Sequence, residues 1–127
     1  MIRILLVDDH ASTREPLAFM LEQEPDLTVV AQAGSVAEAR RTLREAGASV
    51  DVAVVDLGLP GGSGEELIPV LRAAYPRAVA LVLAYCSDRE RLARAVEAGA
   101  SGVLHKSAPL CQAATEIAPS ESARSCL

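Results

Sequence analysis

The chain has 127 residues, the usual size of a single domain, and half of them are hydrophobic. One Phe, two Tyr and no Trp leave no aromatic platform for stacking bases, and a formal net charge of −5 at pH 7 gives no electrostatic attraction for nucleic acid or an anionic membrane. Composition therefore argues against direct DNA binding by this chain and predicts a core built from aliphatic side chains.

Apolar runs alternate with helical patterns along the chain. Strands are predicted, in order, over residues 2–7, 27–31, 52–55, 79–84 and 101–104, and helices between them over residues 13–24, 35–46, 64–75 and 88–98. The third and fourth strands are continuously apolar, which indicates burial on both faces. This alternation is typical of an α/β protein with a parallel sheet.

Two of the predicted helices begin at capping boxes. Ser35 with Glu38, and Ser87 with Glu90, have the spacing at which a hydroxyl and a carboxylate each bind a backbone N–H group at the helix start. We therefore expect local side chains to fix where these two helices begin.

The end of the chain carries a weaker signal. A fifth helix is predicted over residues 110–117, where apolar residues recur at helical spacing. The last residues, 119–127, are polar and aperiodic. We expect one domain over residues 1–118, followed by a polar tail or the stump of a linker.

The cysteines and the apolar runs bear on location. Cys86, Cys111 and Cys126 lie at unrelated spacings, without the close pairs or His partners of a metal site. This usage favours a reducing, cytoplasmic compartment. No stretch reaches the roughly 20 apolar residues that cross a bilayer, so no membrane association is expected.

Charged residues follow three of the predicted strands. Asp8 and Asp9 follow the first strand, Asp56 follows the third, and Lys106 follows the fifth. In an open parallel sheet, ligands bind beyond the carboxyl ends of the strands. If the first and third strands are neighbours, three carboxylates and one ammonium group share this edge. His10, next to the acidic pair, is interpreted as a solvent-exposed residue at the entrance to the first helix.

This set of charges predicts a phosphoryl site. Close carboxylates repel one another unless a cation neutralises them, and carboxylate oxygens partly open to solvent suit Mg²⁺. Beside Mg²⁺ and a lysine, Asp56 is equipped to attack phosphorus and form an acyl phosphate. Polar residues are common at strand ends, so each carboxylate alone has a structural explanation. The group of four charged residues favours the functional one.

Three segments carry a family resemblance. LLVDDH, VVDLGLPGGSGEEL and EAGASGVLHK resemble the receiver domain of bacterial two-component response regulators, and DDHASTRE with EPDLTVVAQAGS resembles the branch that carries a LuxR-type helix-turn-helix output domain. The resemblance extends over residues 2–118. It implies a flavodoxin-like three-layer sandwich, with a five-stranded parallel sheet of order 2-1-3-4-5 and helices on both faces.

The resemblance also implies a role for each residue of the acidic edge. Asp56 matches the phosphoacceptor, Asp9 the direct Mg²⁺ ligand, and Asp8 its partner, often through water. The Gly58 carbonyl matches a backbone Mg²⁺ ligand, and Lys106 matches the lysine that pairs with the phosphoryl group.

Two positions depart from the family pattern. Ala84 stands where members have Thr or Ser at the end of the fourth strand, and Val103 stands where members have an aromatic switch residue. Both halves of the usual hydroxyl-and-aromatic relay are therefore absent, whereas the acidic pocket is retained. The resemblance predicts phosphorylation but puts the usual route of signal transmission in doubt.

The resemblance implies a signalling function. A sensor histidine kinase would phosphorylate Asp56 in a Mg²⁺-dependent reaction, and the domain would control transcription through a partner or through an output domain absent from this chain, with DNA contacted only indirectly. Homodimerisation is common in this branch. The only chemistry expected of the domain itself is self-phosphorylation and slow self-dephosphorylation, so no enzyme activity is predicted.

Two alternatives remain at this stage. A phosphorylation-independent pseudo-receiver would use the fold as a dimerisation or docking module, and Ala84 and Val103 would mark its lost relay. A phosphohydrolase with the haloacid-dehalogenase fold would require a second Asp two residues after the nucleophile. Gly58 occupies that position, which argues against such an enzyme.

Overall fold

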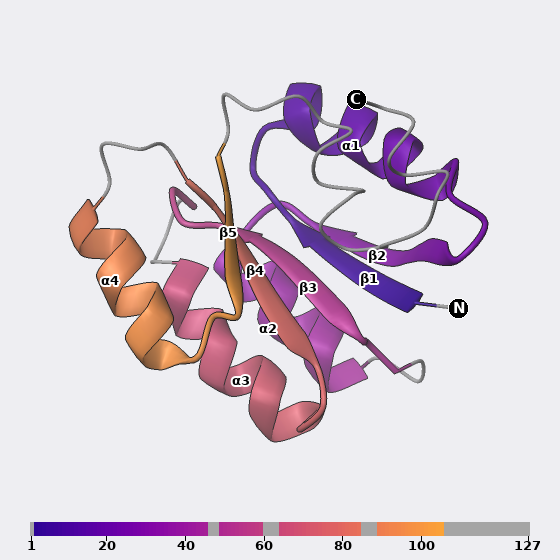
Figure 1. The fold of residues 1–127 in the computed structure, drawn as a ribbon. Coiled ribbons are helices and arrows are strands. Elements are labelled where there is room, and N and C mark those ends of the chain that lie inside the picture. The colour runs from indigo at the N-terminus through magenta and orange to yellow at the C-terminus, as the bar shows by residue number, and fades with distance from the viewer. Residues whose placement is uncertain (1, 46–48, 60–63, 85–88, 106–127) are drawn as a thin grey trace.

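A computed structural model describes residues 2–45, 49–59, 64–84 and 89–105 (Figure 1). The strands are β1 (Ile2–Val7), β2 (Leu27–Ala33), β3 (Val52–Asp56), β4 (Val79–Ala84) and β5 (Gly102–His105). The helices are α1 (Ala11–Glu22), α2 (Val36–Glu45), the short 3₁₀ helix η1 (Gly64–Glu66), α3 (Leu67–Ala74) and α4 (Arg89–Ala98).

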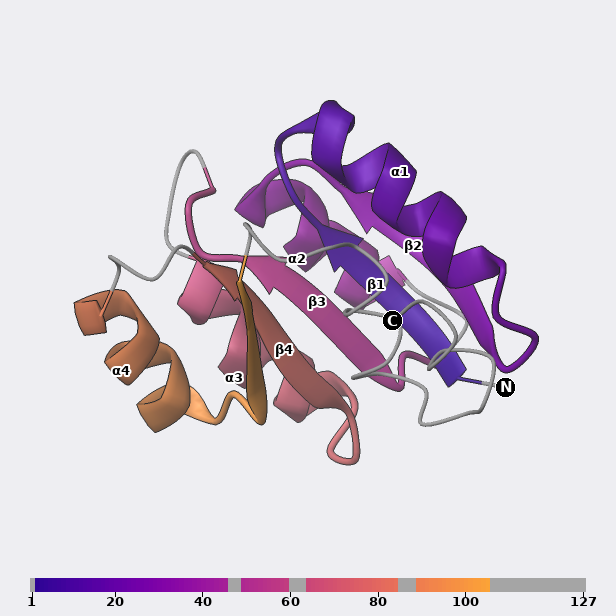
Figure 2. The same cartoon turned by 45° about the horizontal axis from the view of Figure 1, so that its top comes forward.

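The strands form one parallel sheet of order β2-β1-β3-β4-β5, which confirms the predicted topology. Figures 1 and 2 show α1 on one face of the sheet and α2 and α3 on the other. Because β1 and β3 are neighbours with Val7 opposite Val55, their carboxyl ends meet at one edge.

The core lies on both faces of the sheet. In β3, Val52 and Val54 pack on the face that α1 covers, whereas Ala53 and Val55 pack on the face of α2 and α3. All four side chains are buried, so the prediction that the third strand is covered on both sides is confirmed. The central position of β3 therefore leaves the backbone around its end little freedom to move.

Several element boundaries differ from the predicted ones by one or two residues, and two of these differences have a visible cause. β2 extends to Ala33, and an irregularity in its pairing with β1 leaves Val30 as an extra residue, a β-bulge that the apolar pattern does not reveal. α1 begins at Ala11, because the N–H groups of Thr13 and Arg14 both bond to the carbonyl of His10.

The third predicted helix is divided into η1 and α3. Pro69 lies near the start of α3 and has no N–H group, so it cannot donate the helical hydrogen bond to the carbonyl of Glu65. The first turn is accordingly a 3₁₀ turn, which tightens the chain directly after the acidic edge.

The capping box at Ser35 is present in a modified form. The Glu38 N–H donates to the Ser35 hydroxyl at 3.1 Å, whereas the Glu38 carboxylate accepts from the N–H of Gly34, one residue earlier than predicted, at 3.2 Å. The second predicted box, at Ser87, lies outside the described residues. So do the fifth helix at 110–117 and the predicted domain end at residue 118.

Replacing Ser35 by Ala is expected to lower the free energy of unfolding by about 1 kcal/mol, because the N–H of Glu38 loses its acceptor at the start of α2. Urea unfolding followed by far-UV circular dichroism measures this. Ser12→Ala removes a hydroxyl that lies exposed on α1 and serves as the control. Equal unfolding midpoints for the two variants would contradict a capping role.

Among the residues that the structure describes, no helix combines the length and the apolar character that crossing a bilayer requires.

Candidate functional site

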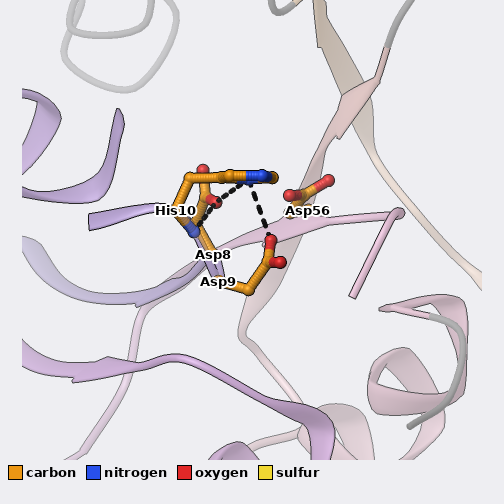
Figure 3. A group of neighbouring side chains, drawn as sticks. All are labelled: Asp8, Asp9, His10 and Asp56. Atoms are coloured by element: carbon orange, nitrogen blue, oxygen red, sulfur yellow. Dashed lines mark hydrogen bonds and ion pairs between the residues drawn. The ribbon is translucent and has the colours of Figure 1, made fainter. Parts of the chain in front are cut away.

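The parallel pairing of β1 with β3 brings the predicted acidic residues together. Asp8 and Asp9 follow β1, and Asp56 is the last residue of β3 (Figure 3). Each of these carboxylates, and the imidazole of His10, offers one ligand atom, and these atoms all lie within 4.8 Å of one another. The predicted juxtaposition of Asp8, Asp9 and Asp56 is therefore present in the fold.

The acidic cluster has a buried floor and an open side. Asp56 is fully buried and Asp8 is 2% exposed, whereas the side chain of Asp9 is 25% exposed. Carboxylates in so small a volume repel one another, and burial raises the cost of their charge. Such a pocket favours a cation that enters from the solvent side and neutralises the carboxylates.

Backbone N–H groups orient the two buried carboxylates. The N–H of His10 donates to Asp8 Oδ1 at 2.9 Å, and the N–H of Gly58 donates to Asp56 Oδ1, also at 2.9 Å. Both bonds close a tight turn two residues after the carboxylate, a geometry that Asp adopts readily. The backbone thus holds Asp8 and Asp56 in defined orientations.

His10 belongs to the cluster more closely than the sequence suggested. Its side chain is 60% exposed, as expected, but its Nδ1 atom lies 3.0 Å from Asp9 Oδ1 and 3.5 Å from Asp8 Oδ1 (Figure 3). The only signal in the sequence was its position directly after two carboxylates. The imidazole therefore borders the open side of the pocket.

Two arginines support the backbone around the cluster, and neither was identified from the sequence. Arg14 donates through Nη1 to the carbonyl of Asp8 at 2.7 Å and through Nε to Gln32 Oε1 at 3.2 Å, which ties the end of β1 to β2. Arg91 of α4 donates to the carbonyl of Leu57 at 3.1 Å. Arginines are common on helix surfaces, so only the tertiary structure distinguishes these two.

Of the four remaining predicted site residues, the structure describes three. Gly58 is exposed, and its N–H bonds to Asp56 Oδ1, while Ala84 ends β4 in register with His105 of β5. Val103 is half-buried in β5 and packs on the core face that α2 and α3 cover. Lys106 lies outside the described residues.

The donor set fits Mg²⁺. It consists mainly of carboxylate oxygens from two adjacent strand ends, bordered by the imidazole of His10, with one side open to water. Magnesium prefers oxygen ligands, is bound through one or two carboxylates in such sites, and keeps several of its waters. The cluster could therefore hold a divalent cation whose remaining positions are open to solvent or to a phosphate group.

Comparison with known proteins identifies similar chains. The family described as response regulator receiver domain matches residues 4–117. The DNA-binding transcriptional activator DevR/DosR of Mycobacterium tuberculosis is 42% identical over 106 residues, which cover 84% of this chain and 48% of that protein. The chain spans about half the length of the curated relatives it matches.

Solved structures of response regulators are also similar to this chain. A LuxR-family two-component response regulator from Aurantimonas sp. SI85-9A1 superposes with a TM-score of 0.79 at 36% identity, covering 91% of this chain and 81% of that one. A response regulator from Burkholderia pseudomallei, solved with a phosphorylated aspartic acid, a calcium ion and citrate, has a TM-score of 0.75 at 27% identity and covers 99% of this chain and 71% of that one.

Proposed function

The chain belongs to the family of response regulator receiver domains, and on that premise we propose that Asp56 accepts a phosphoryl group from a sensor histidine kinase in a Mg²⁺-dependent reaction. The observation that carries this proposal is the convergence of Asp8, Asp9 and Asp56 at the carboxyl ends of β1 and β3. A structural role alone would not require three carboxylates in one small pocket.

The proposed reaction is a transfer between two side chains. A carboxylate oxygen of Asp56 attacks phosphorus, the bond from phosphorus to the kinase histidine breaks, and an acyl phosphate forms on Asp56. The Gly58 N–H fixes the orientation of the carboxylate for this attack. Burial of Asp56 limits the approach of bulk water.

The other residues of the pocket would bind the metal ion and the phosphoryl oxygens. We propose that Asp9, Asp56 and the Gly58 carbonyl hold Mg²⁺, with Asp8 joining through water, and that Lys106 pairs with the phosphoryl oxygens. When bound, the metal would neutralise the charge on the phosphoryl group during transfer. Arg14 would keep the Asp8 backbone in place.

The proposed function also includes the location of the protein and the way in which the domain acts. Receiver domains are generally non-catalytic phosphoacceptors, and we propose no activity here beyond self-phosphorylation and slow self-dephosphorylation. We propose a cytoplasmic protein whose domain spans residues 1–118 and controls transcription through a partner or an output domain, with homodimerisation as one means. The pseudo-receiver alternative is not favoured, because the relatives that this chain resembles are transcriptional response regulators.

Replacing Asp9 by Ala is expected to weaken Mg²⁺ binding by more than about tenfold, because loss even of a group that only supports a metal ligand costs about 10–100-fold in affinity. Isothermal titration calorimetry measures the binding, since the chain has no Trp to report it by fluorescence. Asp26→Ala, which removes an exposed carboxylate just before β2 at the opposite edge of the sheet, is the matched control. No detectable binding by the unmutated protein at millimolar Mg²⁺ would count against the proposed function.

A further inference from the structure

One peptide group connects the proposed phosphoacceptor to helix α4. The carbonyl of Leu57 accepts a hydrogen bond from Arg91 Nη1 at 3.1 Å, and the N–H of Gly58 donates to Asp56 Oδ1 at 2.9 Å. This carbonyl and this N–H belong to the same peptide unit. The chain of contacts therefore runs from the guanidinium of Arg91 through the peptide to the Asp56 carboxylate.

The Arg91 guanidinium acts on both the strength and the direction of the hydrogen bond from the Gly58 N–H to Asp56 Oδ1. Arginine remains charged at all accessible pH values, and a charged donor on a carbonyl polarises the peptide, which makes its N–H a stronger donor. Gly58 is exposed and has no Cβ, so it carries no side chain that would hinder rotation of the peptide. Arg91 therefore favours the orientation in which the Gly58 N–H faces Asp56.

The preceding residue is fixed independently of Arg91. The N–H of Leu57 donates to the carbonyl of Leu83 in β4 at 3.1 Å, and the Leu57 side chain is buried. The chain is thus anchored up to Leu57, and the next peptide is the first that can turn. Arg91 contacts the carbonyl of that peptide.

Helix α4 has a second, weaker contact, which it makes with η1. Arg94 Nε lies 3.9 Å from Glu65 Oε1 in η1, with the Arg94 side chain 59% exposed. An exposed ion pair at this distance contributes little by itself. It nevertheless shows that α4 lies close both to Leu57 and to Glu65.

We propose that Arg91 is a positioning residue for the phosphoacceptor, which it orients through the Leu57–Gly58 peptide, and that this contact couples the state of Asp56 to α4. The coupling rests on the proposed function. Conversion of the Asp56 carboxylate to an acyl phosphate removes negative charge from the oxygen that the Gly58 N–H binds, which weakens the hydrogen-bond chain and the hold on α4. The route uses neither the Ala84 nor the Val103 side chain.

The positioning role is tested on Arg91→Ala without any phosphoryl donor. We expect the Gly58 amide proton to shift upfield in ¹H–¹⁵N NMR spectra, because its hydrogen bond to Asp56 weakens, and Arg91→Lys, which keeps a charged donor, to restore part of the shift. Arg89→Ala removes an exposed arginine from the same helix and is expected to leave the Gly58 amide unchanged. An unchanged Gly58 amide in Arg91→Ala, or the same shift in Arg89→Ala, would overturn the positioning role.

The coupling is tested with acetyl phosphate and with beryllofluoride, both with Mg²⁺. We expect Arg91→Ala to form the phosphoryl adduct about two- to tenfold more slowly, the effect of losing one hydrogen bond. We expect beryllofluoride to change amide hydrogen exchange over residues 89–98 in the unmutated protein but not in Arg91→Ala. If α4 responds equally in both proteins, the coupling is wrong. If the unmutated protein neither forms the adduct nor binds beryllofluoride, the proposed function fails instead, and the NMR test still decides the positioning role.

Discussion

Replacing Asp56 by Asn is expected to abolish the single phosphoryl adduct that acetyl phosphate forms with the protein in the presence of Mg²⁺. The amide has nearly the shape of the carboxylate, and its oxygen still accepts the hydrogen bond from the Gly58 N–H. It is not a nucleophile toward phosphorus and carries no charge for the metal. Intact-mass spectrometry, with and without Mg²⁺, measures the adduct.

The matched control for this experiment lies at the opposite end of the same strand. Asp51 directly precedes β3, and its Oδ2 accepts a hydrogen bond from the N–H of Arg3 at 2.9 Å. Asp51→Asn keeps an acceptor there and is expected to form the adduct normally. A persistent adduct in Asp56→Asn would assign the acceptor to another residue, and no adduct in the unmutated protein would argue that the acidic pocket serves as a metal site only.

Replacing Gly64 by Ala is expected to destabilise the fold by about 3 kcal/mol, the upper part of the range for overpacking a core position. A Cβ at Gly64 would overlap the carbonyl oxygen of Asp56 and would lie 2.9 Å from Val55 Cγ1. Both neighbours belong to the central strand β3, which packs on both faces and cannot move aside. Urea unfolding followed by far-UV circular dichroism measures the loss.

Gly58→Ala is the matched control for Gly64→Ala, because both replace a glycine in the segment after Asp56. A Cβ at Gly58 would meet only Asp56 Oδ1, at an ordinary contact distance of 3.6 Å. Its effect on stability should stay within about 0.5 kcal/mol, as for most surface substitutions. Equal unfolding midpoints for the two variants would mean that β3 adjusts more readily than its packing indicates.

Local patterns in the sequence predicted the strands and the charged residues at their ends, whereas the strand order came from the family resemblance. The run VAVV before Asp56 is apolar without alternation, as expected for a strand buried on both faces. Asp8, Asp9 and Asp56 lie at strand ends, so neighbouring parallel strands suffice to bring them together. Lys106 stays a prediction, since it lies outside the described residues.

Features that depend on tertiary contacts were not predictable. The bulge at Val30 arises from the register between β1 and β2. The apolar pattern of each strand taken alone is regular and does not reveal it. Arg91 is one of several charged residues on α4, and its contact with the Leu57 carbonyl depends on how that helix packs beside the end of β3. The missing N–H of Pro69 was visible in the sequence, but helical periodicity alone extended the predicted helix across it.

The adjacency of β1 and β3 also has a consequence for how the protein matures. The chain between these strands contains α1, β2 and α2, so their pairing closes a long loop, a step that is entropically costly and slow in parallel sheets. Before it, Asp8 and Asp56 are hydrated and far apart, and only afterwards do their carboxylates meet in one pocket. The acidic pocket is therefore a product of late folding, and a nascent or partly unfolded molecule would lack it.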